Sequence, residues 1–251
     1  GKNEFNVTEN GTTGASLFIF ATEDGTISGW NPKTDLTHAI ITVNNSSWAV
    51  YKGLALASTP FGDFLYAANI HAGTVDVFNT NFAPVHFFGG FRDRFLPAGY
   101  APFNIASSNH LLYVSYAKQN AQKNGDVAGA GHGFIDVFDD FGDFLFRLVS
   151  HDHLNSPWGM TIAPSNFGQF SGDLLVGNFG DGHINVYNPF TGRHLGMLRD
   201  AHGHPIVNDH LWALTFGNGN SAGPTTTLFF TAGIGNEAHG LFGQIVSVSN
   251  D

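Results

Sequence analysis

The segment GTVDVF at residues 73–78 decides the fold of this chain, because similar hexapeptides occur at four other places. Each copy has a glycine, a variable residue, a β-branched residue and then an alternating strand. The other copies are GTISGW at 25–30, GFIDVF at 133–138, GHINVY at 182–187 and GQIVSV at 243–248. Their glycines are 48, 60, 49 and 61 residues apart. A recurrence of this length indicates a repeat architecture.

Further strands surround each copy of the hexapeptide. An apolar, aromatic-rich strand precedes it, as in DFLYAAN from Asp63, and a turn with another strand follows, as in NPFTGRHLGML from Asn188. Four copies have a third element still earlier. These elements are YKGLALA from Tyr51, YAPFNIA from Tyr100, SPWGMTIA from Ser156 and HLWALTF from His210. The unit is therefore an antiparallel meander of four strands.

Such a unit predicts an all-β fold, a single β-propeller domain with roughly five blades in this chain. A β-sandwich would not need the same strand five times, and a β-helix repeat would be much shorter. The composition fits, because blades packed on both faces use few charges: only 12% of the residues are charged, and 25 are Phe. The expected blade ranges are 1–46, 47–96, 97–150, 151–205 and 206–251.

The two ends of the chain do not match as terminal blades. Residues 1–32 supply no innermost strand, and the last unit stops just after its third strand. We therefore expect that the chain lacks an N-terminal blade, although closure as an irregular five-bladed ring is the alternative. Unpaired terminal strands can also pair between molecules, which would produce self-association.

Charge and composition exclude several classes of function. The formal net charge of −10 argues against a nucleic-acid partner. No apolar run approaches the roughly 18 residues of a transmembrane segment, and the opening GKNEF lacks the features of a signal peptide. Without cysteine, the chain has no disulfide, thiolate metal ligand or cysteine nucleophile.

Several segments resemble an uncharacterised family of exported bacterial β-propellers that often carry PEP-CTERM sorting signals. They include SLFIFATEDGTISGWNP, FLYAANIHAGTVDVF, SPWGMTIAPSNFG, LLVGNFGDGHINVYNPFTG and TAGIGNEAHGLFG. The resemblance implies about six blades in the full family and an extracellular or periplasmic location. More distantly, the blades look like those of NHL-repeat and gluconolactonase-type propellers. The resemblance supplies no catalytic residue, so the function has to be inferred from the residues of a candidate site.

Turns between second and third strands lie at the same end of a blade as the loops that lead into each innermost strand, because the strands are antiparallel. We call this the upper end. Nine of the 13 histidines belong to it. They are His71, His132, His151, His153, His183, His202, His204, His210 and His239. The upper turns predict ligand-binding roles for Asn69, His71, Asn178, Asp181, Glu237 and His239, and the resemblance implies a histidine at His71 and at His239.

A more specific hypothesis for the upper end is a metal site. His151 with His153, and His202 with His204, are one residue apart, so each pair points to one side of an extended chain. His210, Asp152, Asp181, Asp209 or Glu237 would complete the coordination of Zn, Cu or Ni, which imidazole suits. The loops NFGDG and NGDVAGAG faintly resemble Ca sites. The alternative is that polar turns simply tolerate histidine.

The sequence favours a binding or assembly module over an enzyme, because it offers variable loops and no recognisable catalytic set. The ligand is an unidentified small molecule or protein. The alternative is a metal-dependent hydrolase, lactonase or lyase acting at the central channel. Trp158 and Trp212, on innermost strands, either pack between blades or stack against a ligand. Protonation of every histidine would change the formal charge from −10 to +3, so association is expected to depend on pH.

Overall fold

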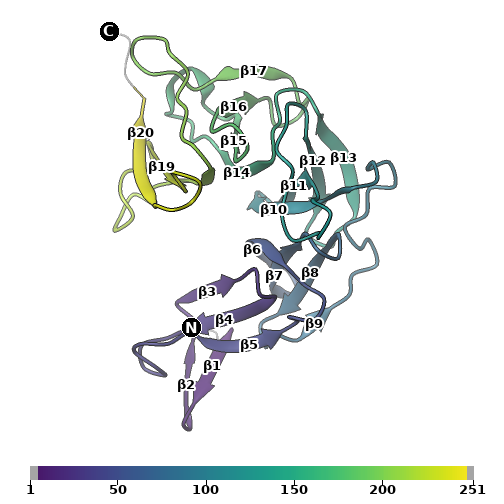
Figure 1. Cartoon of the computed structure of the whole chain (residues 1–251). Helices are drawn as coiled ribbons and strands as arrows, with labels where there is room; N and C mark the ends of the chain where they lie inside the picture. The colour runs from purple at the N-terminus through teal and green to yellow at the C-terminus, as the bar shows by residue number, and fades with distance from the viewer. Residues whose placement is uncertain (1–4, 248–251) are drawn as a thin grey trace. The chain divides into compact units, whose positions relative to one another are not determined.

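A computed structural model describes residues 5–247 and shows an all-β fold (Figure 1). Its one helical element among these residues is a short 3-10 turn, η1 (Gly168–Phe170). The strands form five antiparallel sheets, the blades of a β-propeller, and one separate hairpin. The hairpin consists of β1 (Asn6–Glu9) and β2 (Thr12–Ala15).

Each blade sheet is a meander in which strands that follow one another in sequence are neighbours. The first holds β3 (Phe18–Ala21), β4 (Thr26–Trp30) and β5 (Ile40–Asn44). The second holds β6 (Tyr51–Thr59), β7 (Gly62–Asn69), β8 (Thr74–Asn79) and β9 (Pro84–Val85). The third holds β10 (Tyr100–Ser108), β11 (Leu111–Lys118), β12 (Gly133–Asp139) and β13 (Phe144–Ser150).

The last two sheets follow the same pattern. The fourth holds β14 (Pro157–Ile162), β15 (Leu174–Asn178), β16 (Ile184–Tyr187) and β17 (His194–Met197). The fifth holds β18 (Leu211–Phe216), β19 (Thr227–Ala232) and β20 (Leu241–Val246). The five hexapeptide copies lie on β4, β8, β12, β16 and β20, so the repeat that was read from the sequence is the structural repeat, and the predicted fold is confirmed.

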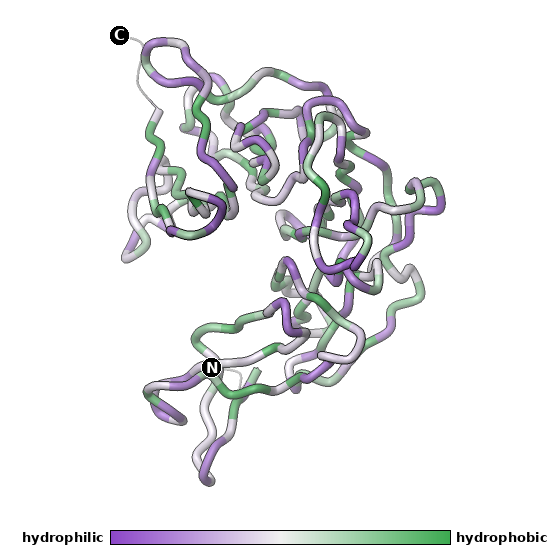
Figure 2. Tube along the Cα trace, in the orientation of Figure 1, coloured by the Kyte–Doolittle hydropathy of each residue, from purple (hydrophilic) through white to green (hydrophobic). Residues whose placement is uncertain are grey.

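The first residues differ from the expected pattern. We expected residues 1–32 to supply only strands of the first blade, but β1 pairs with β2 in a sheet of its own. The tip of this hairpin, which contains Glu9 and Asn10, is hydrophilic (Figure 2). At its other end Val7 is buried in the core beside Ile27 of β4. The hairpin therefore packs against the first blade without joining its hydrogen-bond ladder.

The chain divides into two compact units, each with its own core. Unit 1 comprises residues 1–114, 119–125 and 137–145, and unit 2 comprises residues 115–118, 126–136 and 146–251, so the third sheet contributes to both. A core of unit 1 includes Ile27, Tyr51, Leu65 and Phe78. A core of unit 2 joins the fourth and fifth sheets through residues such as Leu175, Ile184, Leu214 and Phe230. No helix of residues 5–247 is long and apolar enough to cross a membrane.

The middle strands of the fourth sheet are buried on both faces, whereas the first and fifth sheets keep one face exposed. Every residue of β15 and β16 is buried. In the first sheet, Phe18 and Phe20 on one face are 59% and 46% exposed, while Ile27 on the opposite face is buried. Burial on both faces explains the continuous apolar runs and the low charge of the sequence.

Candidate functional site

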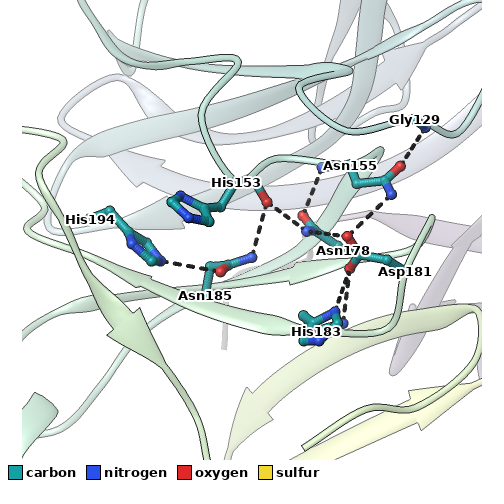
Figure 3. Close-up of polar contacts among 8 residues, drawn as sticks. All are labelled: Gly129, His153, Asn155, Asn178, Asp181, His183, Asn185 and His194. Atoms are coloured by element: carbon teal, nitrogen blue, oxygen red, sulfur yellow. Dashed lines mark hydrogen bonds and ion pairs between the residues drawn. The ribbon is translucent and has the colours of Figure 1, made fainter. Parts of the chain in front are cut away.

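The best-defined polar arrangement lies at the upper end of the fourth sheet, within unit 2. It is built from the turn at residues 179–183, between β15 and β16, and from the loop at residues 151–156 that leads into β14. A tight turn with Gly182 at φ 74° brings the chain from β15 directly back into β16. The two segments meet around Asn178, the last residue of β15 (Figure 3).

Asn178 is completely buried and connects the turn to the leading loop. Its side-chain oxygen accepts the backbone N–H of Asn155 at 3.1 Å. Its amide nitrogen donates to the backbone carbonyl of His153 at 2.8 Å and to Asp181 Oδ2 at 3.3 Å (Figure 3). Because both its oxygen and its nitrogen are engaged inside the protein, the amide of Asn178 holds the loop in place.

Asp181 extends this network toward the surface. Its Oδ1 accepts hydrogen bonds from the backbone N–H of His183 at 3.1 Å and from the ring Nδ1 of His183 at 3.2 Å. Its Oδ2 accepts the side-chain amide of Asn155 at 3.2 Å, and Asn155 Oδ1 accepts the N–H of Gly129 at 2.7 Å. The network therefore ties three separate loops of unit 2 together (Figure 3).

The ring of His153 stacks on His194 of β17, with centroids 4.0 Å apart and planes 14° apart. His194 Nε2 lies 3.2 Å from Asn185 Oδ1, and the amide of Asn185 donates to the carbonyl of His153 at 3.1 Å. Burial, followed by the neighbouring His153, lowers the pKa of His194. The protonated form of His194 is therefore disfavoured in the folded protein.

The histidines predicted to bind metal contact different neighbours. His151 donates to the carbonyl of Gly131 at 2.7 Å and packs on Phe134, whereas His153 packs on His194. The rings of His202 and His204 are 6.3 Å apart. The ring Nδ1 of His210 lies 2.9 Å from Asp209 Oδ1.

Among residues 5–247, no three His, Cys, Asp or Glu side chains are grouped so that they could hold a metal ion. The metal site, whether for Zn, Cu, Ni or Ca, stays a prediction.

The two predicted ligand residues of unit 1, Asn69 and His71, differ in burial. Asn69, at the end of β7, is completely buried, and its Oδ1 accepts the backbone N–H of Val50 at 3.1 Å. Its amide nitrogen donates to Asp76 Oδ2 at 3.1 Å. His71 is exposed in the turn that follows. Asn69 thus holds the loop before β6 in the second sheet, as Asn178 holds the loop before β14 in the fourth.

The innermost strands β6, β14 and β18 each carry a β-bulge at the second or third residue. The register shifts between Tyr51 and Gly53 in β6, between Pro157 and Gly159 in β14, and between Leu211 and Leu214 in β18. The residues inside these shifts include Lys52, Trp158 and Trp212. A bulge turns a side chain away from the regular alternation of the strand, and bulges are frequent next to binding sites.

Trp158 and Trp212 lie together in unit 2, because β14 is adjacent to β18. Their ring centroids are 5.3 Å apart and their planes are at 89°. Phe179, from the turn after Asn178, lies 4.4 Å from Trp212 at 45°. We call Trp158, Phe179 and Trp212 the aromatic corner. All three residues are partly exposed.

Glu237 is the predicted ligand residue that contacts the aromatic corner. Its Oε1 accepts a hydrogen bond from Trp212 Nε1 at 2.9 Å, and its backbone is in the left-handed region with φ 61°. His239, two residues later, is exposed. The structure thus brings Asn178 together with Asp181, and Glu237 together with Trp212.

Sequence reasoning did not select Asn155, Phe179, Asn185 or His194, although all four belong to these contacts. One signal was present: Asn185 occupies the hexapeptide position that Asp76 and Asp136 occupy in their copies. The stacking of His194 on His153 joins residues 41 positions apart and has no local signature.

Comparison with known proteins identifies relatives by sequence. No family model matches the chain. It is 34% identical to one uncharacterised protein of Acanthamoeba polyphaga mimivirus over 250 residues, which cover 95% of this chain and 59% of that protein. It is 31% identical to a second uncharacterised mimivirus protein, covering 96% of this chain and 64% of the other. The chain therefore spans about three fifths of each relative, and these relatives are viral rather than bacterial.

Among solved structures, the chain is similar to an alpha-L-arabinanase of Penicillium chrysogenum complexed with arabinobiose. The TM-score is 0.51 and the sequences are 12% identical, with 91% of this chain and 76% of that chain covered. At this identity the likeness concerns the fold alone.

Proposed function

We propose that this chain is an exported, non-enzymatic β-propeller that binds a ligand or partner at the upper end of its blades. The observation that carries the proposal is the pair of tryptophans at the bulged starts of β14 and β18. A large, partly exposed aromatic side chain supplies much contact area with little loss of conformational freedom, and it is enriched where proteins bind.

The polar network supports binding because it holds the surrounding loops in one conformation. Asn178, Asp181 and Asn155 form hydrogen bonds with backbone groups and with one another. Such a scaffold reduces the entropy that is lost when a ligand binds. The histidine-rich rim belongs to the same proposal, as the outer part of the surface through which a ligand approaches.

Export is a separate part of the proposal. Its support is the resemblance of segments such as SPWGMTIAPSNFG to exported propellers with PEP-CTERM signals and, more distantly, to NHL-type propellers. Fractionation of the source culture, with an antibody against this chain, tests the proposed extracellular or periplasmic location. Recovery of the natural protein only inside cells would contradict it.

The binding proposal is tested on the purified chain with chemically distinct probes. Choline, a neutral disaccharide, Zn²⁺ and Ca²⁺ are titrated separately while thermal unfolding and tryptophan fluorescence are recorded. We expect at least one probe to raise the melting temperature of the unaltered chain and to lose that effect in the variant with both Trp158→Leu and Trp212→Leu.

The same preparation tests the enzymatic alternative. Metal content is measured by elemental analysis, and hydrolysis of aryl esters and simple lactones is assayed with and without a chelator. Stoichiometric metal together with turnover that the chelator abolishes would replace the binding proposal by the hydrolase or lactonase hypothesis. If the probes bind equally well to the unaltered chain and to the variant with both tryptophan substitutions, the ligand binds elsewhere.

A further inference from the structure

A cavity of about 1310 Å³ lies within unit 1, beside the last strands of the first two sheets. Its walls include β5, β8, β9 and the connection at residues 86–94 that follows β9, and every lining residue belongs to unit 1. Cavities that bind small molecules usually enclose roughly 300–1,000 Å³. This cavity is therefore large enough for a ligand with a sizeable apolar body.

The connection at residues 86–94 is fixed to the second sheet by two aromatic side chains. Phe87 packs edge to face on Phe64, with ring centroids 5.1 Å apart. Phe91 is buried and packs edge to face on Tyr66 at 5.7 Å. Because Phe64 and Tyr66 both belong to β7, this wall of the cavity is held in place without a ligand. A preformed wall lowers the entropy that binding costs.

Three large aromatic residues line the cavity and remain exposed. Phe88, in the same connection, is fully exposed, and Trp48, in the turn after β5, is 45% exposed. Phe144, the first residue of β13, is the third. We call Trp48, Phe88 and Phe144 the apolar lining. Contact with an apolar ligand would remove this surface from water, which is the main favourable contribution in such sites.

Two cationic side chains, Arg92 and Arg94, also line the cavity. The whole chain has only ten lysines and arginines, and others such as Lys52 and Arg147 form ion pairs within the protein. Among residues 5–247, neither the guanidinium of Arg92 nor that of Arg94 has a hydrogen bond or an ion pair. Each guanidinium offers a planar set of donors that matches a carboxylate. These donors are available to a ligand.

The carboxylates that line the cavity do not use these donors. Asp76 Oδ2 accepts hydrogen bonds from the hydroxyl of Tyr51 at 3.0 Å and from the amide of Asn69 at 3.1 Å. Asp143 lies against Gly89, where a Cβ would meet its Oδ1. Within the described part of the chain, neither carboxylate forms an ion pair with the two arginines. The cavity therefore combines an apolar lining with unpaired positive charge, which is complementary to an apolar anion.

We propose that this cavity binds an amphiphilic carboxylate, an apolar acid whose body contacts the apolar lining and whose carboxylate binds Arg92 and Arg94. The inference goes beyond the proposed function, because Trp158 and Trp212 belong to unit 2 and this cavity to unit 1. Hydrogen bonds between a guanidinium and a carboxylate carry charge on both partners, so they are stronger than neutral ones. The arginines thus select the head group, and the lining selects the apolar body.

A head-group series tests the ligand class. Octanoate, 1-octanol and octylammonium have alkyl chains of nearly the same length but differ in charge. Isothermal titration at pH 7.5 is expected to show octanoate binding about tenfold more tightly than 1-octanol, and octylammonium more weakly still. Acetate, which has the carboxylate without the chain, is expected to bind at least about tenfold more weakly than octanoate.

Two results of this series would overturn the proposal. If 1-octanol or octylammonium binds as tightly as octanoate, the arginines do not select the head group. If acetate binds as tightly as octanoate, the site takes any small anion and the apolar lining has no part in binding.

Variants then locate the bound acid. Arg92→Gln and Arg94→Gln are each expected to weaken octanoate binding about fivefold or more and to leave 1-octanol unaffected. Phe88→Ala is expected to weaken both ligands about threefold, because it removes apolar surface alone. Arg193→Gln is the matched control: it removes the same charge from an exposed position in unit 2 and is expected to change octanoate affinity less than about twofold.

Circular dichroism confirms that each variant is folded, and the head-group series with Phe88→Ala decides the question should an arginine variant fail to fold. Unchanged octanoate binding in both Arg92→Gln and Arg94→Gln, or an equal loss in Arg193→Gln, would overturn the proposed site.

One further variant separates this inference from the proposed function. The chain with Trp158→Leu and Trp212→Leu is expected to bind octanoate as the unaltered chain does. If octanoate binding is lost there but kept in the arginine variants, the acid binds near the aromatic corner, so the proposed function stands and this inference fails. If octanoate does not bind the unaltered chain, this inference fails, and the probes named for the proposed function decide that function independently.

Discussion

The second and fourth sheets solve the same structural problem with different side chains. In each, a bulge interrupts the start of the innermost strand, and a buried asparagine at the end of the next strand accepts the backbone N–H of the leading loop. The bulged position holds Lys52 in the second sheet and Trp158 in the fourth. The backbone of the repeat is therefore constant, whereas the side chain that it displays is not.

The displayed side chains have different uses. Lys52 forms an ion pair with Glu23, and its side chain is 9% exposed, so the protein itself satisfies its charge. Trp158 instead meets Trp212 edge to face and stays partly exposed. A repeat position fixed by the fold therefore carries a buried, ion-paired lysine in one blade and a partly exposed tryptophan in another.

Substitution of the two buried asparagines, Asn69 and Asn178, is expected to have the largest effect and tests the backbone framework that the second and fourth sheets share. Asn178→Ala leaves the N–H of Asn155 without its buried acceptor and removes one of the two amide donors to the carbonyl of His153. Asn69→Ala likewise removes the acceptor of the N–H of Val50. Each unsatisfied group costs about 1–3 kcal/mol, so we expect the free energy of unfolding to fall by roughly 2–4 kcal/mol in both variants. Urea titration followed by circular dichroism measures this.

Asn81→Ala is the matched control, because Asn81 lies exposed in a turn. Its free energy of unfolding is expected to change by less than about 0.5 kcal/mol. A neutral effect of Asn178→Ala would show that the network does not hold the loop. A large effect in only one of the two buried positions would break the equivalence of the two sheets.

Much of this shared framework could be predicted from the sequence. The hexapeptide copies locate β4, β8, β12, β16 and β20, since glycine punctuation and alternation are local signals. Asn178 and Asp181 lie three residues apart in one turn, so their proximity could also be expected. The expectation that both belong to a ligand site remains a prediction, while the hydrogen bonds that they make are structural.

The rest could not be predicted because it depends on contacts between distant segments. The bulge at Trp158 depends on pairing with β15, and the aromatic corner joins residues 158, 179 and 212, which come from three separate segments. Similarly, the β1–β2 hairpin has a plausible strand pattern, but the sequence does not say which strand it pairs with. Local patterns specify elements, whereas partners arise from tertiary packing.

A glycine follows the bulge in β6 and in β14 and allows the neighbouring innermost strand to approach, which gives a second test. A Cβ on Gly53 would lie 2.7 Å from the Cα of Asn104, and a Cβ on Gly159 would lie 2.5 Å from the carbonyl oxygen of Trp212. Gly53→Ala and Gly159→Ala are each expected to lower the free energy of unfolding by about 1–3 kcal/mol, because the backbones must separate.

Tryptophan fluorescence distinguishes the two glycine variants. Gly159→Ala displaces the backbone of Trp212 and is expected to shift the emission maximum, whereas Gly53→Ala acts on unit 1 and leaves the aromatic corner unchanged. Gly240→Ala serves as the control, since a Cβ there meets nothing within 4 Å. If Gly159→Ala has the stability of the unaltered chain, close approach of β14 and β18 is not required.

The smallest expected effect concerns the pH response of the fourth sheet, where His194 bonds to Asn185. Burial and His153 lower the pKa of His194 below the ordinary value of 6.5, so below pH 6.5 the unfolded chain binds a proton that the folded chain does not. The free energy of unfolding contributed by this group is therefore complete above pH 6.5 and falls as the solution becomes more acidic.

His194→Gln is expected to reduce the slope of the free energy of unfolding against pH between pH 5 and 7. His202→Gln, at an exposed position, is expected to leave this slope unchanged. Urea titrations at several pH values measure the slope, and identical slopes in both variants would mean that the stacked pair with His153 is not what the protein senses.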